Sequence, residues 1–295
     1  MTLPQLMTTR EVAELLRIKE RKVYELAGAN AIPVTRVTGK LLFPRDLVER
    51  WLAQHVDYAP AAPSLHRHPD VVCGSHDPLL EWALRESNSD LASIFDGSSA
   101  GLDRFARGEA VMAGVHLFDA SSGEWNIPAV RAKLPGADVV LVEFARRRQG
   151  LITHPDKAAK LHSVSDIGEL RFVSRQPGAG ARVLFESLCD ASKVGIESLC
   201  LSETVARTEL EVGLAIADGR ADVGFAVEAV ARQLRLGFVS LVQERFDLVV
   251  WRQDYFDPPL QRFLNFCRSE AFVQRAHTFG GYDISCLGKV TYNGA

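Results

Sequence analysis

The stretch RFVSRQPGAGAR, residues 171 to 182, decides the fold of the larger part of the chain. A short apolar strand pattern leads through a Pro-Gly turn into the helical pattern VLFESL. Free backbone N–H groups and the positive end of a helix dipole meet at such a turn, so it can hold an anion. The alternative is an ordinary turn, in which Pro177 and the glycines satisfy backbone geometry while Arg175 and Arg182 lie in solvent.

The sequence around this turn alternates strands with helices. From residue 70, apolar runs and amphipathic patterns follow one another as DVVCGSHD, PLLEWALRES, LASIFDGSSAG, LDRFARGE and AVMAGVHLFD. This βαβαβ order predicts a mainly parallel sheet with helices on its faces. A second α/β unit begins at ADVVLVEFARRRQGLITHP and ends in a predicted strand pair, LGFVSLVQERFDLVVW, followed by helices. We therefore expect two lobes, one of about residues 70–145 and 251–295 and one of about 146–250.

The first 53 residues carry a different pattern. Thr8 and Glu11 form a capping-box signature ahead of one amphipathic helix, and a second helical pattern, KERKVYELAGAN, follows after a tight turn. IPVTRVTGKLLFP then reads as a hairpin, and RDLVERWLAQH as a closing helix. This order predicts a helix-turn-helix with a wing. The residues expected to face inward are Val12, Leu15, Leu16, Val23, Leu26, Leu47, Trp51 and Leu52.

Residues 54–69, QHVDYAPAAPSLHRHP, separate the two regions as a proline-rich linker. His66 and His68 lie in it, and two histidines in such a segment are expected to be solvated rather than to bind a metal. The predicted organisation is a DNA-binding domain at 1–53, this linker, and a ligand-sensing domain at 70–295.

Composition limits the partners of the chain. The net charge of the 295 residues is −3, but residues 1–53 hold nine basic against six acidic side chains, so nucleic acid would bind there. Five widely spaced cysteines are expected to be buried small hydrophobes in a reducing compartment. The chain shows no signal segment and no apolar run long enough to span a bilayer, so we expect a cytoplasmic protein that binds no membrane.

Residues 8 to 53 closely resemble the excisionase-type, MerR-like winged helix-turn-helix, from the entry helix through VYEL to the tail IPVTRVTGKLLFPRDLVERWL. In that family the recognition helix lies in the major groove of double-stranded DNA and the wing contacts the backbone or minor groove. One departure is Lys19, where the family often has serine or threonine as the helix cap. The resemblance implies DNA contacts from Arg21, Lys22, Tyr24, Arg36, Lys40 and Arg45.

The remainder of the chain resembles the type II periplasmic-binding-protein fold, including the effector domains of LysR-type regulators. GSHD, DGSSAGL, GVHLFD, RQPGAGAR and GRADVGFAVEAVARQLRLGFVSLVQERFDLVV are more similar to the molybdate-binding-like domain that is fused to excisionase-type helix-turn-helix modules or to molybdopterin-biosynthesis proteins. The match spans about residues 70 to 280. It implies a two-lobed α/β clamp and, as effector, an anion of the molybdate or tungstate type or a molybdenum-cofactor-related ligand.

In such a clamp, hydroxyl groups of one lobe and main-chain amides of the other would enclose the anion. Ser98 and Ser99 are equally suited to be N-caps, His116 to be a satisfied strand-end residue, and Asp77 is expected to be an N-cap. Two arginines would also suit a carboxylate or a phosphate. The candidate ligand residues are Ser75, Ser98, Ser99, His116, Arg175, Gly178, Gly180 and Arg182.

The hypothesis that follows is a one-component transcription regulator, expected to form a homodimer or higher homo-oligomer because one winged domain is too small to be selective alone. Apart from the effector anion, we expect no cofactor and no metal. A solute-binding protein of a transporter is disfavoured by the DNA-binding head. An enzyme is disfavoured because the sequence offers no nucleophile, base and orienting group together: Ser75, His76 and Asp77 are neighbours along one turn.

Overall fold

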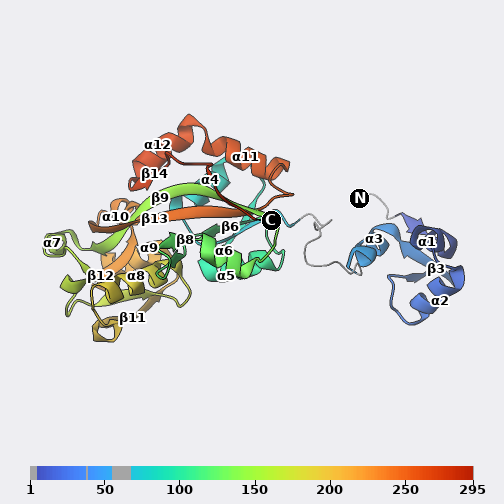
Figure 1. Ribbon diagram of the computed structural model, residues 1–295, viewed down its shortest axis with the longest axis horizontal. Coiled ribbons are helices and arrows are strands. Elements are labelled where there is room, and N and C mark those ends of the chain that lie inside the picture. Colours follow the sequence, from blue (N-terminus) through green and yellow to red (C-terminus); the bar gives the residue numbers. More distant parts are fainter. Residues whose placement is uncertain (1–4, 38, 55–67, 295) are drawn as a thin grey trace. The chain divides into compact units, whose positions relative to one another are not determined.

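The computed structural model describes residues 5–37, 39–54 and 68–294, which fall into two compact units (Figure 1). One unit is Met1–His66 and the other is Arg67–Ala295. Most of the predicted linker, including His66, lies outside the described residues. We describe each unit by itself.

The first unit is a winged helix-turn-helix, as predicted. Thr8 caps the first helix, and its side chain and that of Glu11 form the expected capping box. Arg17 takes a left-handed conformation, with φ of 54°, and turns the chain into the second helix. A short first strand, which the sequence analysis did not predict, pairs with the wing to give the order β1-β3-β2. The elements are β1 (Leu6–Met7), α1 (Thr9–Leu16), α2 (Glu20–Gly28), β2 (Thr35–Val37), β3 (Lys40–Pro44) and α3 (Arg45–Gln54).

The core of this unit is shifted from the predicted positions. Val12 and Val23 are fully buried as expected, but Val48 and Phe43 complete the core. The prediction that three leucines face inward is wrong: Leu15, Leu47 and Leu52 are 38%, 41% and 40% exposed. The face of α3 that packs on the core carries Val48, which is fully buried. The neighbouring Leu47 lies on the opposite face, toward solvent.

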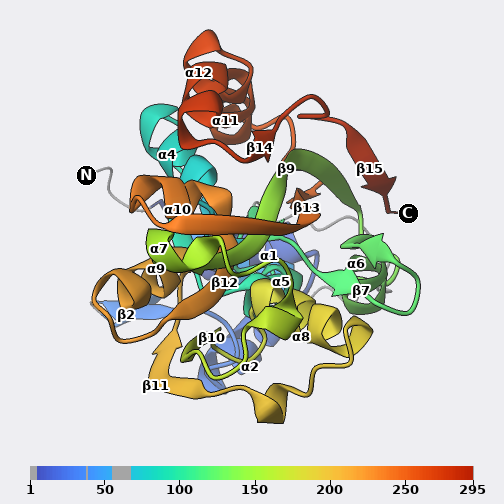
Figure 2. The same ribbon diagram turned by 90° about the vertical axis from the view of Figure 1, so that its left-hand side faces the viewer.

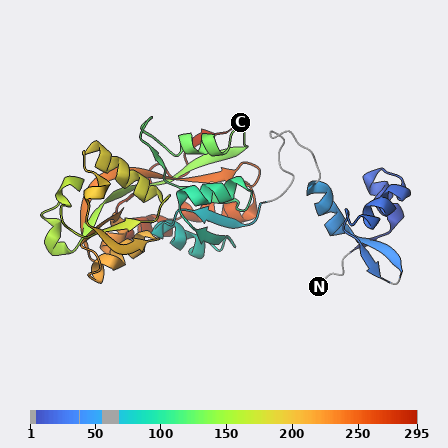
Figure 3. The same ribbon diagram turned by 90° about the horizontal axis from the view of Figure 1, so that it is seen from below.

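The second unit has the predicted α/β architecture. Parallel strands in its two halves carry helices on both faces (Figure 3), and all the larger strands belong to one ten-stranded sheet of order β11-β10-β12-β9-β13-β6-β4-β5, with β14 and β15 paired to β9. The strands and helices of the first half are β4 (Val71–Gly74), α4 (Pro78–Glu86), β5 (Ala92–Phe95), α5 (Ser98–Ala106), β6 (Met112–Val115), β7 (Phe118–Asp119), β8 (Glu124–Trp125) and α6 (Ile127–Lys133).

The second half of the unit repeats this alternation and returns to the first. Its elements are α7 (Pro155–Ala158), β10 (Phe172–Arg175), α8 (Gly180–Ala191), β11 (Leu201–Ala206), α9 (Glu209–Ala217), β12 (Val223–Val227) and α10 (Glu228–Gln233), with short 3₁₀ turns at Val164–Asp166 and Ile196–Ser198. The chain closes with α11 (Pro258–Cys267), α12 (Glu270–Phe279), β14 (Tyr282–Asp283) and β15 (Val290–Asn293). We call β4 to β6 with α4 to α6, α11 and α12 lobe one, and β10 to β12 with α7 to α10 lobe two.

Two long strands join the lobes. β9 (Val139–Thr153) and β13 (Gly237–Trp251) each have 15 residues and pair antiparallel along their length (Figure 2). β9 pairs with β12 of lobe two through its last residues, whereas β13 pairs with β6 of lobe one through Asp247–Val250. The prediction of a strand pair at LGFVSLVQERFDLVVW is therefore wrong. The segment contains no turn residues at its centre, and it forms one continuous strand.

The burial of His68 and of two cysteines also differs from expectation. His68 is not solvated: it is 8% exposed, its Nδ1 lies 2.5 Å from Asp254 Oδ2, and its ring stacks on Trp251. The expectation that the cysteines are buried holds for Cys73, Cys189 and Cys267, but Cys200 is exposed and Cys286 is half-buried. Among the helices of the described residues, none combines the length and the apolar character that a bilayer crossing requires.

Candidate functional site

The first strand of lobe one ends in the predicted ligand turn. Gly74 has φ of 101°, which favours glycine, and a Cβ placed on Gly101 would lie 2.0 Å from the Cα of Gly74. This close backbone contact sets the start of α5 directly beside the turn that carries Ser75. Asp77 caps α4 by accepting a hydrogen bond from the N–H of Leu80 at 2.7 Å, as predicted.

Ser75 belongs to a buried relay of three side chains. Its Oγ lies 2.8 Å from Nε2 of His116, which follows β6, and Nδ1 of His116 lies 2.8 Å from Oε2 of Glu244 on β13. The three residues are 3%, 1% and 0% exposed. The expectation that no nucleophile, base and orienting group lie together is wrong: the fold brings Ser75, His116 and Glu244 within hydrogen-bonding distance from positions 41 and 128 residues apart.

Glu244 is also part of a buried charge cluster on the two long strands. Arg147 of β9 pairs with Glu244 and donates to Asp77 at 2.8 Å, and the hydroxyl of Tyr282 donates to Asp77 at 2.7 Å. Burial opposes ionisation of Glu244, but the charge of Arg147 and the charge and hydrogen bond of His116 outweigh it, and its pKa falls to about 2. Burial together with the nearby Asp77 carboxylate raises the pKa of Tyr282. Two carboxylates thus share one guanidinium.

Two helices point their N-termini at this relay. The N-cap residues of α5 and α8 are Gly97 and Ala179, and neither supplies a side-chain cap. The first N–H groups of a helix have no partner within the helix, so those of Ser98 and Ser99 in α5 and of Gly180 and Ala181 in α8 are available to a ligand. The next N–H of α8, that of Arg182, donates to the carbonyl oxygen of Ala179 at 3.0 Å. In lobe two, Gly178 has φ of 79° and lies in the turn just before α8.

The starts of these helices approach one another across the lobes. A Cβ placed on Gly178 would lie 3.9 Å from the Cβ of Ser99, and one on Gly180 would lie 2.6 Å from the carbonyl oxygen and 3.0 Å from Nε2 of His116. The α8 start therefore faces both the α5 start and His116 of the buried relay. Ser98 is buried and its Oγ accepts a hydrogen bond from the N–H of His116 at 3.2 Å.

The structure thus brings together six of the eight predicted ligand residues: Ser75, Ser98, Ser99, His116, Gly178 and Gly180. The two arginines make their contacts elsewhere. Arg175 is buried, pairs with Glu209 at 3.1 Å and donates to the carbonyl of Arg207. Arg182 pairs with Glu186 one turn further along α8, at 2.7 Å. Both contacts lie within lobe two.

The residues that sequence reasoning missed lie in the middle of the long strands. Glu244, Arg147 and Gln149 are all at most 1% exposed, and Gln149 donates to Glu244 at 2.9 Å. The signal was present in ARRRQG and QERFD, two runs of charged and amide side chains inside long apolar strands. Charged side chains are almost never buried unless they are paired. Two runs of them inside buried strands therefore indicate that residues of the two runs pair with one another.

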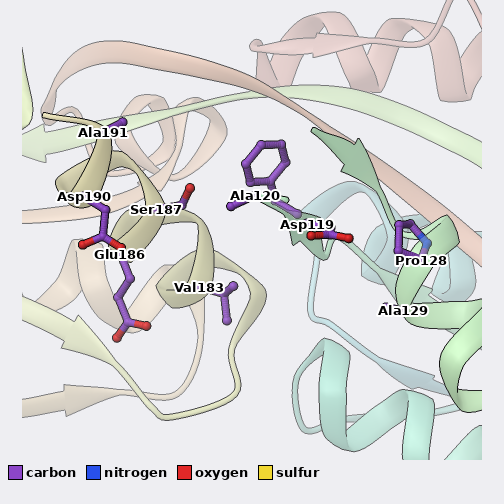
Figure 4. Close-up of a pocket in the computed structure, with 10 residues that line it drawn as sticks. Asp119, Ala120, Pro128, Ala129, Val183, Glu186, Ser187, Asp190 and Ala191 are labelled. Atoms are coloured by element: carbon purple, nitrogen blue, oxygen red, sulfur yellow. The ribbon is translucent and has the colours of Figure 1, made fainter. Parts of the chain in front are cut away.

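A separate cavity lies beside α8, and its charged lining residues are acidic. It has a volume of about 810 Å³ and is lined by α8 on one side and by β7 and the start of α6 on the other (Figure 4). Its charged lining residues are Asp119, Glu186 and Asp190, all acidic, so it is not suited to an anion. None of the eight predicted ligand residues lines it. Within the described part of the chain, no group of three or more His, Cys, Asp or Glu side chains could hold a metal ion.

The predicted DNA-contacting residues are exposed on the first unit. Tyr24 is 54% exposed, and Arg21 and Lys22 both pair loosely with Glu25, at 3.4 and 3.2 Å. Arg36 donates to the carbonyl of Ala27 at 2.8 Å and so ties the wing to the end of α2. Lys40 and Arg45 are also exposed, and Arg45 pairs with Glu49 at 2.8 Å. Lys19 is the N-cap of α2 without a side-chain cap, as its residue type led us to expect.

Comparison with known families agrees with this division. A family model of the PBP superfamily domain matches residues 81–268, and a model of the helix-turn-helix domain matches residues 6–56. Together these are the parts of a ligand-responsive DNA-binding regulator.

Individual proteins that match this chain have low sequence identity to it. The Bacillus subtilis (strain 168) protein described as "Uncharacterized protein YvgK" is 21% identical over 299 residues, with 96% of each chain covered. A Clostridium pasteurianum protein, "Uncharacterized protein in ferredoxin 2Fe-2S gene 5'region", is 30% identical over 84 residues, which cover 28% of this chain and 74% of its own. A phosphate-bound putative phosphate ABC transporter substrate-binding protein from Clostridium perfringens superposes with a TM-score of 0.51 at 16% identity, covering 75% of this chain and 99% of its own. At this identity the likeness concerns the fold.

The charge cluster generates a stability prediction. Arg147→Met leaves two buried carboxylates without their guanidinium, and breaking a buried ion pair in this way costs about 3–5 kcal/mol in the free energy of unfolding. The matched variant Arg148→Met loses an exposed guanidinium whose partner Glu228 keeps Arg232, and should cost less than about 1 kcal/mol. Urea unfolding of both variants at pH 7 measures the difference.

The difference in stability between the wild type and Arg147→Met should depend on pH. Because the pKa of Glu244 is lowered from 4.5 to about 2, its ionised form stabilises the fold above pH 4.5, and this contribution disappears as the pH falls toward 2. The gap between the wild type and Arg147→Met should shrink over that range. Equal costs for the two variants, or a constant gap, would contradict the proposed pairing.

Proposed function

The chain belongs to the PBP superfamily through its larger unit, and because a helix-turn-helix domain precedes that unit, we propose that it is a transcription regulator controlled by a small anion. The observation that carries the anion is the meeting of two uncapped helix N-termini, one from each lobe, beside Ser75 and His116. Main-chain amides and helix dipoles neutralise an anion without burying a full countercharge next to it.

The contacts of the site limit the size of the anion. The starts of α5 and α8 lie close together, so the ligand must fit against first-turn amides and short hydroxyl groups rather than in a large apolar cavity. We propose a tetrahedral oxyanion of the molybdate or tungstate type, or a molybdenum-cofactor-related ligand that carries such a group. A carboxylate or phosphate metabolite is the alternative, because the same amides would accept it. The two arginines are not needed, since both are engaged within lobe two.

The effect on DNA would follow from closure of the lobes. A ligand that bridges α5 and α8 favours the closed state by its differential affinity for that state. We propose that a homodimer, acting in the cytoplasm, places two winged units on an operator and that closure changes how they are held. The α2 surface with Arg21, Lys22 and Tyr24 would read the major groove, and the wing with Lys40 would contact the backbone.

The anion is tested by thermal unfolding in the presence of molybdate, tungstate, sulfate, phosphate and small carboxylates. A ligand at 100 times its Kd should stabilise the protein by about 2.7 kcal/mol. Gly180→Ala should abolish most of this gain, because its Cβ would meet the carbonyl oxygen of His116 and hold the lobes apart. Ser165→Ala, at an exposed position of lobe two, is the matched control. An unchanged gain in Gly180→Ala would place the ligand elsewhere.

DNA binding is tested separately. Arg21→Ala combined with Lys22→Ala should weaken operator binding and lower the salt dependence of the affinity, because two positive charges are lost from the surface that would read the major groove. Fluorescence anisotropy with operator fragments selected from random DNA measures this, and the thermal gain from the anion should stay at the wild-type value. Loss of both activities would show that the two units are not separable.

The relay of Ser75, His116 and Glu244 favours a second candidate, hydrolysis of a carboxylic ester. Ser75 Oγ would attack the ester carbonyl while His116 takes its proton at Nε2, and the alcohol would leave with that proton. Water would then cleave the acyl-serine in the same way and release the acid. The amides at the start of α5 would face the oxyanion.

A fluorophosphonate probe separates the two candidates, because it labels a nucleophilic serine covalently and leaves an anion-binding serine unmodified. For a regulator without hydrolase activity we expect no labelling of the wild type by intact-protein mass spectrometry. Labelling that disappears in Ser75→Ala and persists in Ser99→Ala would instead establish the hydrolase.

A further inference from the structure

A smaller cavity lies on the side of the larger unit where α12 packs against α4 and α10 (Figure 2). Its volume is about 180 Å³, which is the space that about six water molecules occupy in the liquid. Most of its wall belongs to lobe one and comes from α4, the turn before α4, and α12. Leu210 of α9 and Gln233 of α10 complete the wall from lobe two. A ligand in this cavity would therefore contact both lobes.

The wall of this cavity contains an arginine that forms no ion pair with any described residue. Arg275 and Phe279 lie four positions apart on α12, so they share one face of the helix. The central carbon of the Arg275 guanidinium lies 4.4 Å from the centre of the Phe279 ring and 5.3 Å from that of the Trp82 ring. Such contacts use the flat face of the guanidinium and leave the N–H groups along its edge for an acceptor. Nε of Arg275 is buried and has no hydrogen-bond partner within the described structure.

A second buried nitrogen of the wall is also without a partner. Nε2 of His76 lies 3.0 Å from Oε2 of Glu81, and Nδ1 is buried with no hydrogen bond to the described residues. Buried polar atoms are nearly always hydrogen-bonded, so two such atoms on one cavity indicate a polar ligand. Of the other charged lining residues, Glu81 is engaged with His76, and Arg85 pairs with Glu86 at 3.4 Å. The charge left for a ligand is that of Arg275, which favours an anion.

We propose that this cavity is a second ligand site, which binds a small monocarboxylic acid with an apolar body. The carboxylate would accept two parallel hydrogen bonds from the edge of Arg275, one of them from Nε. The hydrocarbon part would pack on Trp82, Phe279 and Leu210. Because this ligand contacts both lobes, it would favour the arrangement in which α9 and α10 lie close to α4 and α12. The site is separate from the proposed oxyanion site, since no residue at the starts of α5 and α8 lines the cavity.

The experiment is an NMR titration of the full-length protein labelled with nitrogen-15 tryptophan, in which each of the four tryptophans gives one indole signal. Trp82→Phe identifies the signal of Trp82. The probes are isovalerate, the neutral isovaleramide of the same shape, and valine, which adds an ammonium group to the isovalerate skeleton. We expect isovalerate to shift the Trp82 signal until it saturates. Isovaleramide should bind roughly tenfold more weakly or worse, because it lacks the charge that strengthens the hydrogen bonds from Arg275.

Arg275→Gln should weaken isovalerate binding by a similar factor of roughly ten or more. The matched control is Arg268→Gln, which removes an exposed arginine at the end of α11 that does not line the cavity, and it should keep the wild-type affinity. If Arg275→Gln does not fold, the comparison of the acid with its amide in the wild type decides alone. Equal affinities for the two, or no shift of the Trp82 signal with isovalerate, overturn the proposal. Tighter binding of valine also overturns it and assigns the cavity to amino acids.

Discussion

Arg147 holds the larger unit together at the point where its two lobes meet. The guanidinium is fully buried between the carboxylates of Asp77 and Glu244 and over the ring of Phe246, at 4.4 Å. A buried charge is tolerated only when it is paired and hydrogen-bonded, so each of these groups depends on the others. Asp77 caps α4 of lobe one, whereas Glu244 lies on the strand that leads from lobe two. The cluster therefore fixes the start of α4 to the two long strands, and the turn with Ser75 is held between them.

The site follows from this arrangement with few further requirements. Parallel strands direct their carboxyl ends, and the helix starts behind them, toward the same side of a sheet. Since α5 and α8 both begin without a side-chain cap, the proposed anion would meet first-turn amides of both lobes. The two predicted arginines are not among its contacts, because Arg175 and Arg182 are engaged with Glu209 and Glu186. The proposed recognition therefore rests on dipoles and hydroxyl groups.

Local sequence patterns predicted the fold and the turns of the candidate site. They did not predict the side chains that reach this site from distant strands. The capping box at Thr8 and Glu11, the cap at Asp77 and the glycine turn at 178–180 are properties of a few neighbouring residues, so the sequence exposes them directly. The relay is different: Glu244 reaches His116 only because β13 runs on from lobe two to pair with β6, and the prediction had divided β13 into two strands. The contacts of the arginines were missed for another reason. An arginine beside a turn can reach a ligand or a nearby glutamate, and only the helix spacing of Arg182 and Glu186 could have indicated which.

The glycines of the site show how closely closure is specified. Gly101 lies against Gly74 with no room for a Cβ, so α5 is set permanently on the turn of Ser75 within lobe one. A Cβ on Gly180 would likewise clash, at 2.6 Å from the carbonyl oxygen of His116, but this contact joins the two lobes. The first pair defines the shape of one half of the site, and the second defines how far the halves approach. A residue with a side chain at position 180 would leave the lobes intact and change only their separation. Because Gly180 is also the first residue of α8, the glycine that permits this contact would set the distance over which the proposed anion bridges the lobes.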